Sequence, residues 1–224
     1  WGNRMIELVS VNVGKRAELG QRHGQTVLSG IRKAPISGRE VEVQQVNILG
    51  DGQADLVHHG GVDKAIFAYP QPHLQQWSDE LDLPESFRPG RIGDNLTIGN
   101  LTETDVCIGD IWQWGGVELQ ISQPRIPCYK LAMAVGNPLI VKRWYQTGQC
   151  GWYVRVLATG TTSIDTPLTI KVRDAAGITV HETALVLFQD ATEARRREIA
   201  DHPALSTAWR NALIDLIEAE SVRV

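Results

Sequence analysis

Residues 105–130 read D-V-C-I-G-D-I-W-Q-W-G-G-V-E-L-Q-I-S-Q-P-R-I-P-C-Y-K, a pattern of two apolar segments around a glycine pair, followed by a proline-containing segment. Asp105–Trp114 and Val117–Ser122 are rich in β-branched and aromatic residues, which favour strands. Gly115-Gly116 stands between them, and two glycines permit the tight turn of a hairpin. We therefore predict two antiparallel strands joined by this turn.

The segment that follows the hairpin, Ser122–Lys130, is predicted to be a rigid loop. Pro124 and Pro127 have a fixed φ and no amide hydrogen, so they fit neither a continuing strand nor a helix interior. A loop of this kind holds its side chains in place at the end of a strand.

Cys128 lies in this loop with Arg125 and Lys130 close in sequence. Nearby positive charge favours the thiolate over the thiol. The thiolate is the form that attacks electrophiles, carries a persulfide or binds a soft metal. Cys128 is therefore a candidate functional residue, whereas we expect Cys107 and Cys150 to be buried and inert.

Further strands and helices are separated by glycine and proline. Short apolar segments predict strands at Met5–Val13, Val41–Leu49, Ala65–Tyr69, Tyr153–Ala158 and Leu168–Val172. Helical spacing is present in Pro72–Leu81 and Pro138–Gln146. Many strands with irregular connections predict an α+β fold with a curled or barrel-like sheet.

The pattern changes after about Ala175 and predicts three short helices. Thr179-x-x-Glu182 has the spacing of a capping box ahead of an apolar run, and Glu193–Ala200 follows. The last helix is indicated by apolar residues at helical spacing: Leu205, Trp209, Leu213, Leu216 and Ile217. We expect a β-rich domain over residues 5–175 and a three-helix extension over residues 176–224. The extension is too small for its own core, so it should pack on the domain or on a second copy in a homodimer.

Composition limits the classes of partner. The 224 residues include 22 basic and 26 acidic side chains, a net charge of −4 with neutral histidine. Proteins that bind nucleic acid through its phosphates are usually basic, so no nucleic acid partner is expected. No apolar stretch reaches the roughly 20 residues of a membrane-spanning helix, and the N-terminus lacks the pattern of a signal peptide. We expect a cytoplasmic protein that does not associate with a membrane.

Two further polar segments could carry chemistry. Adjacent His58 and His59 would point to opposite faces of a strand, which does not suit a shared metal. Gly60-Gly61 could bring backbone amides close to an oxyanion, although a plain glycine-rich turn is the alternative. The segment Gly93–Thr97 is by itself a polar turn around Asn95.

Together, four segments resemble the MOSC-domain family. They are G-D-G-Q-A-D-L-V-H-H-G-G-V-D-K-A-I (50–66), G-D-N-L (93–96), G-D-I-W (109–112) and S-Q-P-R-I-P-C-Y-K (122–130). MOSC proteins are relatives of the C-terminal domain of molybdenum-cofactor sulfurases. The three-helix tail is similar to the extension of the bacterial YiiM-like branch. The resemblance runs from about Val41 to the end of the chain.

The resemblance implies a domain that binds the pterin–molybdenum cofactor. By position, Cys128 would be the sulfur donor or the molybdenum ligand, while Arg125 and Lys130 would serve the terminal phosphate or the charge of the metal–oxo group. The other cofactor-binding candidates are His59, Gly60, Gly61, Asp63, Lys64 and Asn95. Asp94 stands where the family often has glutamate, which leaves the role of that position open.

Three hypotheses on function follow. The first is a molybdenum-dependent reductase of small N-hydroxylated compounds, such as N-hydroxylated purine bases, with Cys128 as the metal ligand. The chain has no iron–sulfur cysteine cluster and no G-x-G-x-x-G motif, so a separate protein would supply electrons. The second is a non-catalytic carrier that holds the cofactor or a persulfide on Cys128. The third makes the tail an interaction module whose apolar face forms a dimer seam.

Overall fold

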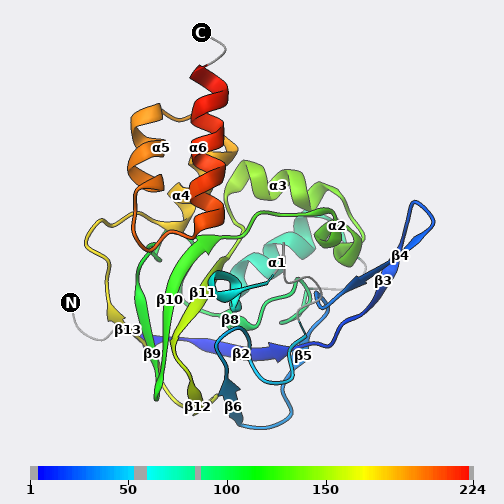
Figure 1. The fold of residues 1–224 in the computed structure, drawn as a ribbon. Coiled ribbons are helices and arrows are strands. Elements are labelled where there is room, and N and C mark those ends of the chain that lie inside the picture. The colour runs from blue at the N-terminus through cyan, green and yellow to red at the C-terminus, as the bar shows by residue number, and fades with distance from the viewer. Residues whose placement is uncertain (1–4, 53–59, 84–86, 222–224) are drawn as a thin grey trace.

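The computed structural model describes residues 5–52, 60–83 and 87–221. Its main feature is a nine-stranded sheet (Figure 1). In spatial order the strands are β1 (Met5–Ile6), β13 (Leu168–Val172), β9 (Ile111–Trp114), β10 (Val117–Pro124), β11 (Trp152–Ala158), β7 (Ile66–Pro70), β8 (Leu96–Ile98), β2 (Leu8–Val13) and β5 (Ala34–Pro35). Neighbouring strands are antiparallel, except that β7 and β8 are parallel.

The sheet curls back on itself. β1 and β2 lie toward opposite ends of the strand order, yet in the chain only Glu7 separates them. The predicted α+β class with a curled sheet is confirmed. The predicted hairpin is also present, because β9 and β10 pair on either side of Gly115-Gly116.

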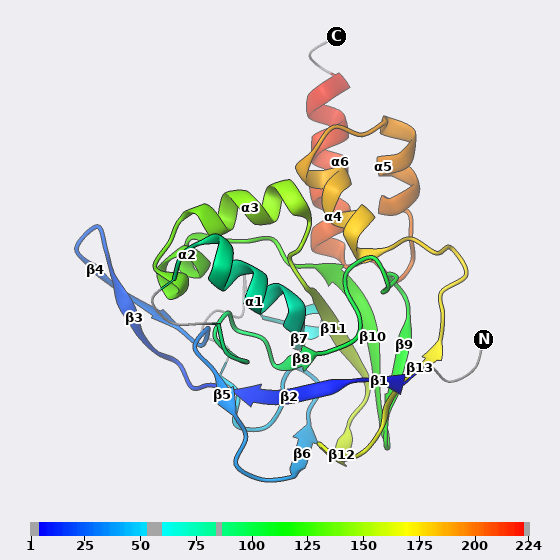
Figure 2. The ribbon, with the colours of Figure 1, turned by 180° about the vertical axis from the view of Figure 1, so that it is seen from behind.

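Two small two-stranded sheets extend from this body. One pairs β12 (Gly160–Ser163) with β6 (Glu40–Val43), and the other pairs β3 (Ala17–Arg22) with β4 (Gln25–Ser29). The β3–β4 hairpin projects beside α2 (Tyr129–Val135), as both ribbon views show (Figures 1 and 2). The sequence did not predict this hairpin, because its strands are mostly polar and only Leu19 and Val27 are buried.

Helices cover one side of the sheet. α1 (Gln71–Glu80) and α3 (Leu139–Thr147) lie with α2 on this side (Figure 2), and a short 3-10 helix, η1 (Val62–Lys64), precedes β7. Trp77 of α1 and Trp144 of α3 are fully buried in the hydrophobic core. None of the helices in the described ranges is long and apolar enough to cross a membrane.

The C-terminal segment forms the three expected helices, α4 (Val180–Phe188), α5 (Glu193–Ala200) and α6 (Thr207–Ser221). The hydroxyl of Thr179 accepts a hydrogen bond from Glu182 N at 3.0 Å, which is half of the predicted capping box. Ala184 and Trp209 are buried in the same hydrophobic core as the strands. The helices therefore share a core with the sheet rather than forming one of their own.

Two predicted strands are shorter than the sequence indicated. β6 ends at Val43, because Gln44 N donates to Asn47 O at 2.9 Å and turns the chain, so that Val43 pairs with Ile48. Likewise, β9 begins only at Ile111. The carboxylate of Asp110 accepts hydrogen bonds at 2.9 Å from the amides of Cys107 and Asp174, which fold the preceding residues into turns.

Candidate functional site

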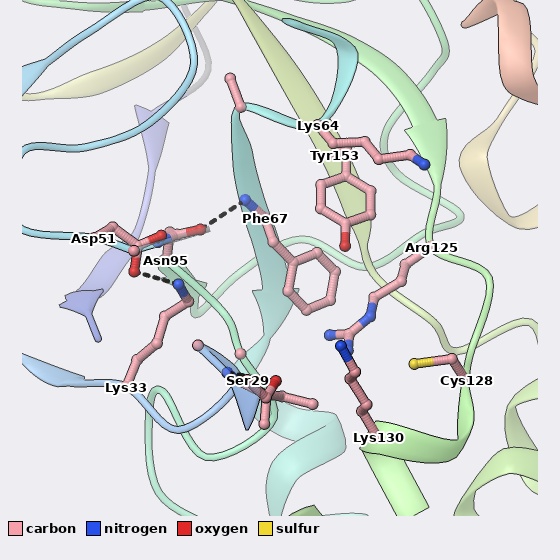
Figure 3. A pocket seen from close by; sticks show the side chains of 15 residues that line it. Ser29, Lys33, Asp51, Lys64, Phe67, Asn95, Arg125, Cys128, Lys130 and Tyr153 are labelled. Carbon is pink, nitrogen blue, oxygen red and sulfur yellow. Dashed lines mark hydrogen bonds and ion pairs between the residues drawn. The ribbon is translucent and has the colours of Figure 1, made fainter. Parts of the chain in front are cut away.

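A pocket lies where the curled sheet meets the β3–β4 hairpin and the start of α2 (Figure 3). The space between its walls, including the part open to solvent, is about 620 Å³. Its lining residues come from segments far apart in the chain: Ser29, Gly30, Ile31, Lys33, Asp51, Gly52, Lys64, Ala65, Phe67, Gly93, Asn95, Arg125, Cys128, Lys130 and Tyr153.

Arg125 is a buried cation in the wall of this pocket. It is 8% exposed, and its guanidinium lies over the ring of Phe67 at 4.5 Å and over that of Trp144 at 5.5 Å. Its Nη1 donates to Ile92 O at 2.7 Å. Within the described residues no carboxylate forms an ion pair with it, although buried charges are normally paired. Within the part of the chain that the structure describes, the pocket therefore presents a positive charge without a paired carboxylate, which suits an anion.

Cys128 faces the same pocket from the residue just before α2 (Figure 3). It is partly exposed, and its side chain makes no capping hydrogen bond to the helix. The backbone just before Cys128 is held in place, because Arg125 N donates to Gly151 O at 3.3 Å and Tyr145 Oη donates to Pro127 O at 3.4 Å. β10 runs on through Pro124, so the rigid loop is shorter than predicted.

A polar cluster forms the opposite wall. Asn95 is buried, and its Nδ2 donates to Asp51 Oδ2 at 3.0 Å and to Asn12 O at 3.1 Å, while its Oδ1 accepts from Phe67 N at 3.0 Å. The other oxygen of Asp51 forms an ion pair with Lys33. Burial lowers the pKa of Lys33, against the opposing effect of Asp51.

Glycines let the backbone segments of this wall approach closely. A Cβ at Gly30 would lie 2.2 Å from the carbonyl oxygen of Gly52, so no larger residue fits there. Gly93 has a φ of +96°, and its Cβ would lie 3.1 Å from Ile31 and 3.5 Å from the guanidinium of Arg125. Glycine at these two positions therefore lets the segments that carry Ile31, Gly52 and Arg125 pack against one another.

Not all of the candidate residues in the segment 59–64 line the pocket. Lys64, at the end of η1, lines it, whereas the carboxylate of Asp63 forms an ion pair with Arg155 at 2.7 Å and is absent from the lining. Gly60 and Gly61 are half-buried and also outside the lining. His59 lies outside the described residues, as does His58.

The structure thus brings together five of the candidates that the sequence indicated. They are Cys128, Arg125, Lys130, Lys64 and Asn95. Asp94 is not among the lining residues. It is fully buried and accepts hydrogen bonds from Gly90 N and from the Thr97 hydroxyl, and burial raises its pKa. The position where the family often has glutamate therefore stabilises the turn before β8.

Nothing in the sequence identifies three of the lining residues as part of a site. Lys33 follows no motif, and Phe67 and Tyr153 stand in strands where an aromatic residue is ordinary. The hydroxyl of Tyr153 points into the pocket (Figure 3), and burial raises its pKa, so it keeps its proton. The rings of Phe67 and Tyr153 are 5.1 Å apart and form the apolar part of the wall.

The described side chains alone do not make a metal site. Within the described residues there is no group of three or more His, Cys, Asp or Glu side chains placed to hold an ion. The other two cysteines, Cys107 and Cys150, are buried, and burial raises the pKa of each. Cys128 is therefore the only described thiol in the pocket, and a metal bound there would need other ligands.

Comparisons with known proteins agree with this architecture. A family model described as the MOSC domain matches residues 55–175. YflK of Bacillus subtilis is 40% identical over 204 residues, which is 91% of this chain and 90% of YflK. A protein of Gibberella moniliformis named Reductase is 36% identical over 155 residues, 68% of this chain but 27% of that longer protein.

The fold is also that of a solved structure. The crystal structure of YiiM from Geobacillus stearothermophilus superposes with a TM-score of 0.78 at 34% sequence identity, covering 95% of this chain and 99% of that one. The family model covers more than half of the chain, and the likeness extends through the C-terminal helices. The chain therefore belongs to the MOSC-domain family, in which it is similar to the YiiM proteins.

Proposed function

We propose that the protein binds a molybdenum cofactor in this pocket and reduces N-hydroxylated compounds, with Cys128 as the ligand of the metal. One observation carries the proposal. The partly exposed thiol of Cys128 and the buried guanidinium of Arg125 face the same pocket. The guanidinium has no carboxylate partner among the described residues. Membership of the MOSC family and the name of the Gibberella relative, Reductase, support it.

The residues of the pocket fit the parts of such a cofactor. A thiolate is a preferred ligand of soft metals. A metal at Cys128 would have to bring its other ligands with it, which the dithiolene sulfurs of the pterin would provide. Arg125 and Lys130 would hold the terminal phosphate, because a guanidinium and an ammonium are its usual partners. The rings of Phe67 and Tyr153, which line the same pocket, would suit contact with a planar ring.

When bound, the cofactor supplies the two-electron redox chemistry that side chains lack. Reduction of R–NHOH breaks the N–O bond, consumes two electrons and two protons, and gives R–NH2 and water. A separate donor protein would supply the electrons. The chain would orient the substrate: the Tyr153 hydroxyl, which stays protonated because burial raises its pKa, could donate a hydrogen bond to it, and the Lys64 side chain also lines the pocket.

The test compares two cysteine variants with the wild type, all made in a host that produces the cofactor. Reduction of N6-hydroxyadenine is followed with a chemical electron donor. We expect Cys128→Ala to have no measurable turnover and Cys107→Ala, which alters a buried thiol outside the pocket, to keep it. Circular dichroism checks that both variants fold. Turnover by Cys128→Ala would refute the role of this thiol.

The same samples distinguish the carrier hypothesis. If the wild type holds the cofactor but turns over no N-hydroxylated compound, a carrier is favoured over a reductase. A persulfide on Cys128, seen as a sulfur adduct by mass spectrometry of freshly purified protein, would point to sulfur transfer instead.

A further inference from the structure

Cys128 borders a second pocket, on the side away from Arg125 and Asn95. This pocket shares Lys64, Cys128 and Tyr153 with the first one. Its other walls are Gln123 of β10, Ile126 and Pro127 of the loop that follows, and Ala208 and Trp209 of α6. The C-terminal helices therefore form one wall of a pocket that opens onto the candidate metal ligand.

Hydrogen bonds around Ser122 hold these walls in place. The carbonyl oxygen of Ser122 accepts from Ser206 N at 3.0 Å, which fixes the start of α6 beside the end of β10 (Figure 1). The hydroxyl of Ser122 lies 2.6 Å from Asp63 O, just before Lys64, and 3.0 Å from Tyr153 O. One residue thus connects η1, β11 and α6, the elements that line the second pocket.

The chemistry of the second pocket differs from that of the first. Its surface is mainly apolar, and Ile126, Pro127 and Trp209 are among its apolar lining residues. Gln123 is 2% exposed, and its Oε1 has no hydrogen-bond partner within the described residues, while its Nε2 donates to Pro124 O at 3.2 Å. A buried acceptor without a donor is costly to the fold, which suggests that a ligand supplies the donor.

We propose that this second pocket binds the ring of the substrate, a planar, uncharged heteroaromatic compound with an N–H group that donates to Gln123 Oε1. The inference rests on the proposed function, because it places the N-hydroxyl group of that ring at Cys128. The first pocket then holds the cofactor, and the three-helix extension forms part of the substrate site. The apolar walls favour flat rings over charged or sugar-bearing compounds.

Ala208 offers a clean test, because it is exposed in the first turn of α6 and yet lines the pocket. Ala208→Phe fills the pocket without removing a core contact. Ala219→Phe makes the same change at an exposed position near the other end of α6 and serves as the control. Gln123→Leu removes the unpartnered acceptor and keeps an apolar side chain of similar size.

Binding of N6-hydroxyadenine is measured by isothermal titration calorimetry, and molybdenum is measured in the same samples. We expect Ala208→Phe and Gln123→Leu to weaken binding at least about tenfold, with Ala219→Phe unchanged. N-phenylhydroxylamine, whose ring has no N–H, should lose affinity in Ala208→Phe but not in Gln123→Leu. Melting temperatures of all three variants should stay close to that of the wild type.

Two results would overturn the inference: wild-type affinity in Ala208→Phe, or no binding of N6-hydroxyadenine to the wild type. The molybdenum content is a separate readout. Binding that depends on Ala208 and Gln123 in protein without molybdenum would support the second pocket and count against the proposed function. Turnover that depends on molybdenum and is unchanged in Ala208→Phe and Gln123→Leu would support the proposed function and count against the second pocket.

Discussion

Asn95 donates a hydrogen bond from Nδ2 to Oδ2 of Asp51 at 3.0 Å, which joins two polar segments that lie 44 residues apart in the chain. Asn95 also accepts from Phe67 N on the central strand β7, and Asp51 forms an ion pair with Lys33. This cluster fixes the wall of the pocket opposite Cys128.

Asn95→Asp should destabilise the fold. The variant loses the two hydrogen bonds that Nδ2 donates and places a carboxylate against that of Asp51. We expect a loss of about 2–4 kcal/mol in the free energy of unfolding, measured by urea denaturation. Asn137→Asp is the control, because only its Oδ1 is used, as an acceptor from Leu139 N. A loss of similar size in both variants would contradict the assigned role of Asn95.

Lys33 should make stability depend on pH. Burial lowers the pKa of the folded-state ammonium below its usual 10.5, so the unfolded chain holds this proton to a higher pH than the folded chain does. Between the two pKa values the unfolded state binds more protons, and the free energy of unfolding therefore rises with pH. The stability of the wild type relative to Lys33→Met should increase as the pH rises toward 10.5. If the stability of the wild type relative to Lys33→Met stayed constant or fell as the pH rose, the burial of this charge would be contradicted.

The three thiols should differ sharply in reactivity. Cys128 is partly exposed, whereas Cys107 and Cys150 are buried with raised pKa values. Iodoacetamide should therefore modify one thiol of the native protein quickly and all three only after unfolding. Peptide mapping by mass spectrometry should place the fast modification at Cys128, and Cys128→Ser should abolish it. Equally fast modification of Cys150 would show that the core around it opens readily.

Lys130 should contribute to anion binding through its charge. Lys130→Met removes one cation from the pocket, whereas Lys142→Met removes an exposed cation on α3 that lies outside it. We expect the first variant to retain several-fold less cofactor after purification, with a larger loss at high salt, and the second to match the wild type. Equal retention in the two variants would mean that Lys130 does not touch the phosphate.

The sequence predicts those parts of the structure whose signals lie in adjacent residues. The hairpin across Gly115-Gly116 and the helix that begins after Thr179 both depend on a few neighbouring residues. α2 was not predicted, because it has only seven residues and begins after a cysteine that makes no capping bond. The turn before Ile111 depends on Asp110 contacting Asp174, which only the folded chain brings near.

The candidate site likewise contains residues that the sequence could identify and residues that it could not. Cys128, Arg125 and Lys130 stand close together in sequence and meet in the pocket. Lys33 lies 18 residues before Asp51 and could not be identified, because its importance comes from burial and from that one partner. Asp63, by contrast, was a candidate that forms an ion pair with Arg155, 92 residues further along the chain.

Elemental analysis for molybdenum in the wild type and in Cys128→Ala, both purified from a cofactor-producing host, tests whether Cys128 holds the metal. We expect close to one molybdenum per chain in the wild type and almost none in the variant, with both proteins folded. Absence of molybdenum from the wild type, together with absence of pterin fluorescence after oxidation, would contradict the proposal.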